Sequence, residues 1–424
     1  MIMYWDNVEL CNRLGQGLTW HPHDSREWMW RFFDIEHRVK TPITDAGIWY
    51  TTLGGKRIFI NNREGRTNVI EHGLPAHVLE AMQHKKLIVV LDNSTEGQEY
   101  TSGMFWRMHL TMERHGLPNN SLVIITGAWG QHEQYLKWCR ERGEQPRAIF
   151  SYAPCSLDAP GEKQPTMPIV KAMNNPDAKD YLSLNQTVKV HRLEHVYWLI
   201  KNNILDKGLV SASHIREGSM QVGHWNVGKS MTFMPEVSLE EFKLHMSKNL
   251  PLHVDGDWTE VHPDTANLGY YNRVLHENSL LYFITESEFV QNIPFITEKT
   301  LKAFSSGQPF IMLNGPGALE QLNTMGFKTE LCGIDTAYDA VQDPVARFTM
   351  ANQELLKWCN LTREQQIAKI QDSMQDLEHN YELVYKTFPG INLDNLAMSE
   401  HQHGRAQRSE LVQQIDAIFE YWGQ

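Results

Sequence analysis

The sequence predicts an α/β fold of two Rossmann-like domains that face a cleft, followed by a helical C-terminal segment. Two stretches in which short apolar runs alternate with amphipathic segments predict it, because strands and helices alternating at this spacing form parallel sheets with right-handed crossovers. A less regular stretch with five prolines, residues 153–180, separates them and is the best linker candidate. The length of 424 residues also favours two domains over one.

In the first half of the chain, the pattern is regular from residue 86 onward. Strands are predicted where short apolar runs end at polar turns, and helices where apolar residues recur every three or four positions. The predicted strands are Leu87–Leu91, Leu122–Ile125 and Arg147–Tyr152, and the predicted helices are Thr101–His115 and Gln131–Arg142. Before residue 86 we expect a helix at Ser25–Phe33 and two strands around the Gly54-Gly55 turn within Gly47–Asn61.

The second half repeats the alternation. The predicted strands are Tyr181–Leu184, Leu209–Ser211, Leu280–Thr285 and Pro309–Leu313, and the predicted helices are His191–Leu205, Thr297–Ser305 and Ala318–Met325. The chain beyond Pro344 reads as helical. We therefore expect an N-terminal acceptor domain over residues 1–178, a donor domain over 179–350, and C-terminal helices over 351–424 that pack across both. Ligands of open parallel sheets bind beyond the carboxyl ends of the strands, which here means the cleft.

Composition excludes several classes of protein. The net charge of −12 counts against tight, non-specific nucleic-acid binding, although a local basic groove is compatible with it. The five cysteines show neither paired nor zinc-ligand spacing, which favours a reducing compartment and no structural metal. No apolar run approaches about 18 residues and no signal-peptide pattern opens the sequence, so a cytoplasmic protein without a membrane span is expected.

The segment from Leu281 to Phe327 contains the best candidate for a binding site. Its first strand ends in Glu286, and the next helix begins with Thr297, a good N-cap residue, followed by Glu298 and Lys299. The free N–H groups and positive dipole end of such a helix favour anions. Lys299 conflicts with that dipole, and a local conflict of this kind is expected at functional sites. A lysine there suits a phosphate, and the neighbouring carboxylate suits ribose hydroxyls.

Glycines mark the following turn. Gly315 and Gly317 stand between a strand and the helix that begins at Ala318, where they let the backbone approach a ligand closely. The N-terminus of this second helix could then share a diphosphate. The alternative is an ordinary helix start followed by an ordinary strand–turn–helix loop, since a capping residue followed by Glu-Lys is common.

Short motifs in this region resemble a known family. Phe295-Ile-Thr-Glu-Lys299, preceded by Tyr282-Phe-Ile-Thr-Glu286 and followed by Ala303-Phe-Ser-Ser-Gly-Gln-Pro309, is similar to the donor-binding signature of fucosyltransferase-like glycosyltransferases with the GT-B fold. With Asp335–Asp339 and Asp343–Arg347 included, residues 180–350 resemble glycosyltransferase-like proteins of bacteriophages, some of which modify hydroxymethylated DNA bases. Thr-Glu-Ser-Glu stands where fucosyltransferases have Phe-Glu-Asn-Ser, so neither fucose nor a guanine nucleotide is implied.

The resemblance implies a nucleotide-sugar donor, no cofactor and no required metal. Glu298 would bind the donor ribose and Lys299 the diphosphate. Asn185 and His191-Arg192 look like the family's Asn…His-Arg segment, which makes Arg192 a candidate phosphate ligand. The alternative for Arg192 is a surface arginine on an amphipathic helix.

Sugar transfer with inversion also needs a general base for the acceptor hydroxyl. Asp92, at the end of the Leu87–Leu91 strand, is the first candidate and Glu96 the second. The alternative is that Asp92 caps a turn and Glu96 is solvated.

These features leave three functions to compare. The first is a glycosyltransferase whose acceptor is a hydroxymethylated pyrimidine of phage DNA, a glycan or a small molecule. The second is a non-catalytic nucleotide- or sugar-binding protein, because fold alone does not establish activity. The third, a dehydrogenase or P-loop phosphotransferase, is disfavoured because neither GxGxxG nor GxxxxGK[ST] occurs.

Overall fold

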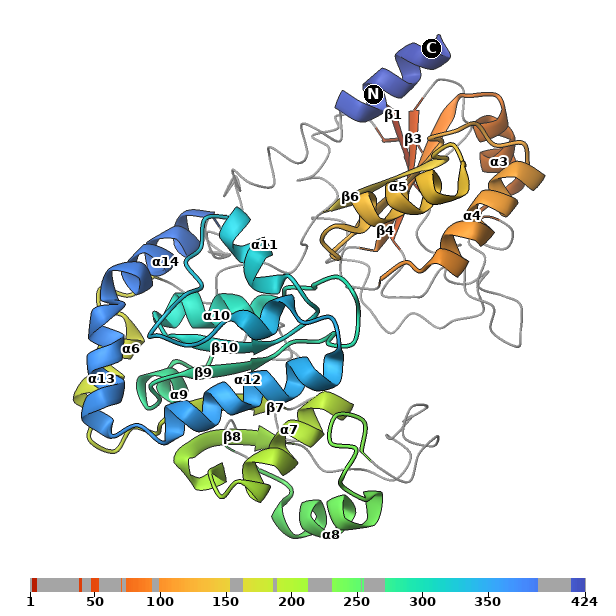
Figure 1. Ribbon diagram of the computed structural model, residues 1–424. Coiled ribbons are helices and arrows are strands. Elements are labelled where there is room, and N and C mark those ends of the chain that lie inside the picture. Colours follow the sequence, from red (N-terminus) through yellow and green to blue (C-terminus); the bar gives the residue numbers. More distant parts are fainter. Residues whose placement is uncertain are drawn as a thin grey trace. The chain divides into compact units, whose positions relative to one another are not determined.

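The computed structural model describes residues 2–5, 38–39, 47–52, 70, 74–93, 99–152, 163–185, 189–212, 231–252, 254, 271–387 and 413–423. The helix expected at Ser25–Phe33 and the second strand expected within Gly47–Asn61 lie outside these residues. The chain divides into two compact units, shown in Figure 1: Met1–Cys155 with Glu400–Gln424, and Ser156–Ser399. This division falls inside the proline-rich stretch, and the expected boundary at residue 178 stays a prediction.

The first unit contains a six-stranded, fully parallel sheet in the order β2-β1-β3-β4-β5-β6. Its strands are β1 (Ile2–Trp5), β2 (Arg38–Val39), β3 (Gly47–Thr52), β4 (Leu87–Asn93), β5 (Leu122–Thr126) and β6 (Ala148–Tyr152). Its helices include α3 (Ala76–Gln83), α4 (Ser102–Arg114) and α5 (Gln131–Arg142). The predicted elements from residue 86 onward are confirmed. The helix over residues 413–422 belongs to the same unit.

Periodic apolar residues explain why these helices form where they do. Met104, Met108 and Met112 recur every fourth position on α4 and are all buried in the core of this unit. Since β4, β5 and β6 follow one another in the same direction, right-handed crossovers place α4 and α5 on the same face of the sheet.

The second unit contains a four-stranded parallel sheet in the order β10-β9-β7-β8. Its strands are β7 (Tyr181–Asn185), β8 (Gly208–Ala212), β9 (Tyr282–Thr285) and β10 (Phe310–Leu313). Among its described residues, the helices are α6 (Pro168–Asn174), α7 (Val190–Lys201), α8 (Leu239–Asn249), α9 (Arg273–Glu277), α10 (Glu298–Ser306), α11 (Ala318–Thr324), α12 (Pro344–Cys359), α13 (Arg363–Asp372) and α14 (Met374–Thr387). The α/β class with two parallel, Rossmann-like sheets is thus confirmed. That the two sheets face one cleft stays a prediction.

The order of this sheet reverses between β7 and β9. The chain first moves from β7 outward to β8, then returns to place β9 and β10 on the other side of β7. Right-handed crossovers therefore put α7 and α10 on opposite faces of the sheet, with their N-termini at the carboxyl ends of β7 and β9. This reversal is a topological switch point, the position where open α/β sheets bind ligands.

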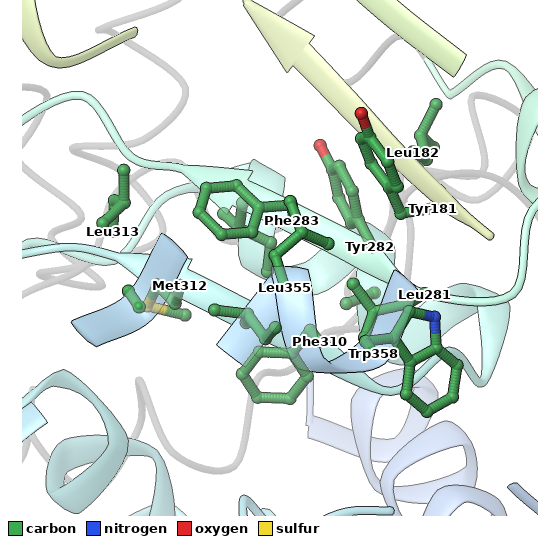
Figure 2. Close-up of a cluster of buried hydrophobic side chains, with 14 of the residues drawn as sticks. Tyr181, Leu182, Leu281, Tyr282, Phe283, Phe310, Met312, Leu313, Leu355 and Trp358 are labelled. Carbon is green, nitrogen blue, oxygen red and sulfur yellow. The ribbon is translucent and has the colours of Figure 1, made fainter. Parts of the chain in front are cut away.

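Apolar packing fixes α12 on this sheet. Figure 2 shows Leu355 and Trp358 of α12 in one cluster with strand residues such as Phe283 and Phe310, and all four side chains are buried. The strands are apolar along almost their whole length, as expected for a parallel sheet with both faces covered.

The proline-rich stretch is a linker over at most part of its predicted length. Pro168 occupies the first turn of α6, where a proline fits because the first N–H groups of a helix lack partners in any case. Met167, Ile169, Ala172 and Ala178 are buried in the core of the second unit. The interpretation of residues 168–180 as linker was therefore wrong, because Pro168 starts a helix and does not break the fold.

The C-terminal segment divides between the units. Helices α12, α13 and α14 belong to the second unit, whereas the helix over residues 413–422 belongs to the first. Among the described residues, no helix is both long and apolar enough to cross a membrane.

Candidate functional site

The candidate site lies at the switch point of the second sheet, where β7 and β9 end side by side. Asn185 is the last residue of β7 and Thr285 the last of β9. The hydroxyl of Thr285 donates a hydrogen bond to Oδ1 of Asn185 over 2.8 Å. The two strand ends are therefore joined directly, and the helices that follow them, α7 and α10, begin at the same edge.

Glu286 anchors the start of α10. Its carboxylate accepts the N–H of Thr297 at 3.0 Å, the hydroxyl of Thr297 at 2.6 Å and the hydroxyl of Thr300 at 2.7 Å. The side chain is completely buried. Glu286, which the sequence places in the candidate binding segment as a donor-site residue, thus has both carboxylate oxygens engaged within the protein, and its negative charge already compensates the positive end of this helix.

Lys299 and Glu298 are more accessible than Glu286. Nζ of Lys299 lies 2.9 Å from Oε1 of Glu298, 3.1 Å from Oγ1 of Thr297 and 3.4 Å from Oγ of Ser287. Their side chains are 20% and 10% exposed. Burial opposes ionisation of Glu298, but the ammonium groups of Lys299 and Lys302 outweigh it and lower the pKa of this carboxyl. Glu298 is therefore an acceptor of hydrogen bonds.

Arg192 and His191 approach the same edge from α7. Arg192 donates from NH2 to the carbonyl of Thr285 at 3.0 Å, and Nε2 of His191 donates to the carbonyl of Glu286 at 2.9 Å. Burial lowers the pKa of Arg192, and the carboxylates of Glu286 and Glu298 oppose this effect. Arg192 is only 3% exposed, so its interpretation as a surface arginine is wrong.

The first turn of α7 carries positive charge where the dipole disfavours it. No acidic residue stands in this turn, whereas Lys189 is its N-cap residue and Arg192 follows. Burial, and then the charge of Arg192, lower the pKa of His191, which is neutral as a result. A helix start that accepts this electrostatic cost is typical of a functional site.

Lys189 is a site residue that sequence reasoning missed. Its Nζ donates to the carbonyl of Ser287 and lies 3.1 Å from Oε1 of Glu288. The signal was available in part, because a lysine at the N-cap of α7 conflicts with the dipole as Lys299 does at the start of α10. Its partners, however, lie almost one hundred residues away and follow β9.

A buried chain of hydrogen bonds, also missed, runs behind the site. Oδ1 of Asn352 lies 2.7 Å from Nδ1 of His195, and Nε2 of His195 lies 3.1 Å from the hydroxyl of Ser183. Because the amide oxygen only accepts, Nδ1 carries the proton and Nε2 accepts from Ser183. The Ser183 oxygen in turn accepts from Nδ2 of Asn185 at 2.9 Å. This series of hydrogen bonds fixes the orientation of the Asn185 side chain and, through it, that of the Thr285 hydroxyl.

The glycines after β10 contact the protein itself. A Cβ on Gly315 would lie 2.5 Å from the carbonyl oxygen of Ile293, so the close approach at this position is to backbone. Gly317 has φ +83° and caps α11. The N–H of Leu319, in the first turn of α11, donates to Oδ2 of Asp339 at 3.0 Å. A carboxylate of the protein thus occupies this helix N-terminus, which the sequence suggested as a second binding position for the diphosphate.

Arg347 secures the loops around the site. Its side chain is buried and donates to the carbonyl of Asn314 at 2.9 Å and to that of Phe289 at 2.7 Å. The guanidinium also lies over the Phe289 ring, 4.9 Å from its centroid. The segments that follow β9 and β10 are therefore tied to α12.

The two candidates for the general base lie in the first unit. Asp92 is within β4, where it pairs with Thr52 of β3 and Ile125 of β5, so the strand extends beyond its predicted end at Leu91. Glu96 lies outside the described residues. Within the described ranges, no group of three or more His, Cys, Asp or Glu side chains gathers as a metal-ligand set.

Fold and site together define an α/β protein whose second sheet gathers Lys189, Arg192 and Lys299 at its topological switch point. No family model matches the sequence, and no curated protein matches it. Among solved structures, the chain is similar to CalG4, the calicheamicin glycosyltransferase, with a TM-score of 0.31 and 11% sequence identity. That alignment covers 94% of this chain and 99% of that chain, and a likeness at this level carries no conclusion about activity.

Proposed function

We propose that the protein is a glycosyltransferase that takes its sugar from a nucleotide-diphosphate donor bound at the β7/β9 switch point. One observation carries the proposal: the fold brings Arg192 and Lys299, from the starts of two different helices, to the same strand ends, with ionised Glu298 beside them. The resemblance of Phe295–Lys299 to a donor-binding signature supports it.

Each side chain has a role that its surroundings permit. Lys299, which is partly exposed, would bind the diphosphate, and the buried charge of Arg192 would add to the positive field from behind the strand ends. Glu298 would accept hydrogen bonds from the ribose hydroxyls. As the bond between the sugar and the diphosphate breaks, these fixed charges stabilise the leaving group without a metal.

The acceptor side is proposed for the first unit. A carboxylate there, Asp92 first and Glu96 second, would remove the proton of the acceptor hydroxyl while the hydroxyl oxygen attacks the anomeric carbon of the sugar. The new carbon–oxygen bond replaces the bond to the diphosphate, and the transition state resembles that of glycoside hydrolysis.

Thermal unfolding in the presence of UDP, GDP, CDP and ADP tests the donor site. A ligand of the native state raises the midpoint of unfolding. We expect one of these nucleotides to do so, and we expect Lys299→Ala and Glu298→Ala to lose the shift. Lys248→Ala, on the exposed face of α8, is the control and should keep it. Equal shifts in all three variants would place the nucleotide elsewhere and overturn this donor site.

A hydroxymethylated pyrimidine of DNA is the proposed acceptor, on the resemblance to bacteriophage proteins. Nucleosides released from hydroxymethylated DNA after incubation with protein and donor should show the mass of the added sugar. Donor consumption with a glycan or small molecule but not with DNA would refute this acceptor and keep the enzyme. Nucleotide binding without donor consumption on any acceptor would favour a non-catalytic binding protein.

A further inference from the structure

We infer that Lys189 and Lys299 form a two-lysine clamp for the diphosphate of the ligand, and that Glu288 holds Lys189 until the ligand displaces it. This inference rests on the proposed function, since it concerns the same site. It adds Lys189 as a phosphate ligand, and it gives Glu288, to which the sequence motifs assign no role, that of a competing carboxylate.

Ser287 lies between the two lysines. Nζ of Lys189 contacts its carbonyl oxygen, and Nζ of Lys299 lies 3.4 Å from its Oγ. The two ammonium groups come from the starts of α7 and α10, on opposite faces of the sheet, and meet at a single residue. Two cations that contact the same residue are placed to bind neighbouring phosphates of one diphosphate.

The side chains of Lys189 and Lys299 are more exposed than that of Arg192, the third cation of the site. The side chain of Lys189 is 33% exposed and that of Glu288 31%, and the pair lies 3.1 Å apart. A partly exposed ion pair contributes little to stability, so exchanging its carboxylate for a phosphate costs little. Arg192, in contrast, is buried and bound to the carbonyl of Thr285, so it has no comparable freedom to change partner.

If a phosphate replaces Glu288 as the partner of Lys189, Glu288 must affect how strongly the ligand binds. In the resting protein its carboxylate neutralises Lys189, and a bound diphosphate would bring negative charge to the same ammonium group. The carboxylate thus competes with the ligand and repels it. Removing the charge of Glu288 should therefore strengthen binding, which a merely structural role of the Lys189–Glu288 pair does not predict.

Equilibrium titrations with three probes test the clamp. The probes are inorganic pyrophosphate, the nucleoside diphosphate that stabilises the protein most, and the corresponding nucleoside. Lys189→Ala should weaken binding of both diphosphates about tenfold, as expected for loss of one charge-assisted hydrogen bond, and leave nucleoside binding unchanged. Lys189→Arg should restore most of the affinity. Glu288→Gln should bind both diphosphates several-fold more tightly.

Lys171→Ala is the matched control, because Lys171 forms a similar exposed ion pair with Glu277 at 2.9 Å in the same unit. Nucleotide binding that is unchanged in Lys189→Ala would overturn the clamp and leave the proposed function standing. Pyrophosphate binding that depends on Lys189, without any nucleotide binding, would support the clamp and overturn the function. If no probe binds the unaltered protein, both fail.

Discussion

The carboxylate of Glu286 accepts hydrogen bonds from both the hydroxyl and the N–H of Thr297, at 2.6 and 3.0 Å. One residue follows β9 and the other begins α10, so this contact sets where Glu298 and Lys299 stand at the edge of the sheet. It also places an internal anion at the start of α10. In the proposed donor site, a phosphate would therefore be bound mainly by lysine side chains, and the first N–H groups of the helix would contribute less than the sequence suggested.

We expect Glu286→Gln to destabilise the second unit by about 1–3 kcal/mol, because an amide nitrogen would replace a buried oxygen that only accepts. Chemical denaturation measures the loss. Glu378→Gln, at an exposed position on α14, serves as the control and should change little. If both variants unfold at the same denaturant concentration, Glu286 does not anchor the helix start.

Arg192→Lys should lower kcat/KM for the donor at least tenfold, as roughly one charge-assisted hydrogen bond is lost. Lysine keeps the charge but loses the planar guanidinium, whose NH2 reaches the Thr285 carbonyl. Separate kcat and KM values show whether donor binding or the chemical step is affected. Arg140→Lys, exposed on α5, controls for the substitution itself. Unchanged kcat and KM values in Arg192→Lys would show that Arg192 does not contribute to donor binding or transfer.

Local patterns predicted the regular elements, and contacts between distant segments account for what was missed. The predicted helix Gln131–Arg142 is α5 as observed, because its apolar spacing and the following Gly143 define both ends locally. The candidate pair Glu298 and Lys299 was visible because the conflict with the dipole is local too. The partners of Lys189 follow β9, so only the folded sheet shows that this lysine belongs to the site.

The motifs at Asp335–Asp339 and Asp343–Arg347 also depend on distant contacts. The sequence resemblance gave them no physical role. In the structure Asp339 caps α11 and Arg347 binds the loops after β9 and β10, so both motifs support the site from outside it. Side chains that act through distant backbone N–H and carbonyl groups leave no periodic signal in a sequence.

Two glycines after β10 should respond differently to alanine. The new Cβ of Gly315→Ala would lie 2.5 Å from the Ile293 carbonyl oxygen, where backbone must shift, at a cost of about 1–3 kcal/mol or more. Gly317→Ala meets nothing closer than 3.9 Å but keeps φ +83°, which costs about 1–2 kcal/mol. Denaturation midpoints compare the two, and a larger loss in Gly317→Ala would contradict the close approach at Gly315.

Buried titratable groups make stability depend on pH. Burial lowers the pKa of His195 to about 3 and that of His276 to about 4. Below an ordinary histidine pKa of about 6.5, the unfolded chain binds protons that these native imidazoles do not, so stability falls as pH decreases from there. Burial raises the pKa of Glu194 to about 7. Between about pH 4.5 and 7 this residue binds more protons in the native protein than in the unfolded chain, so its contribution to stability rises as pH decreases. It therefore offsets the contribution of one histidine.

The contribution of one histidine can be isolated. Each buried imidazole changes the free energy of unfolding by about 1.4 kcal/mol per pH unit between its two pKa values. His276→Gln removes one such group and can keep a hydrogen bond to the side-chain oxygen of Gln308. The His276→Gln variant should therefore lose less stability between pH 6.5 and 5 than the unaltered protein does, by about 1.4 kcal/mol per pH unit. Parallel curves for the two proteins would mean that His276 is charged in the native state.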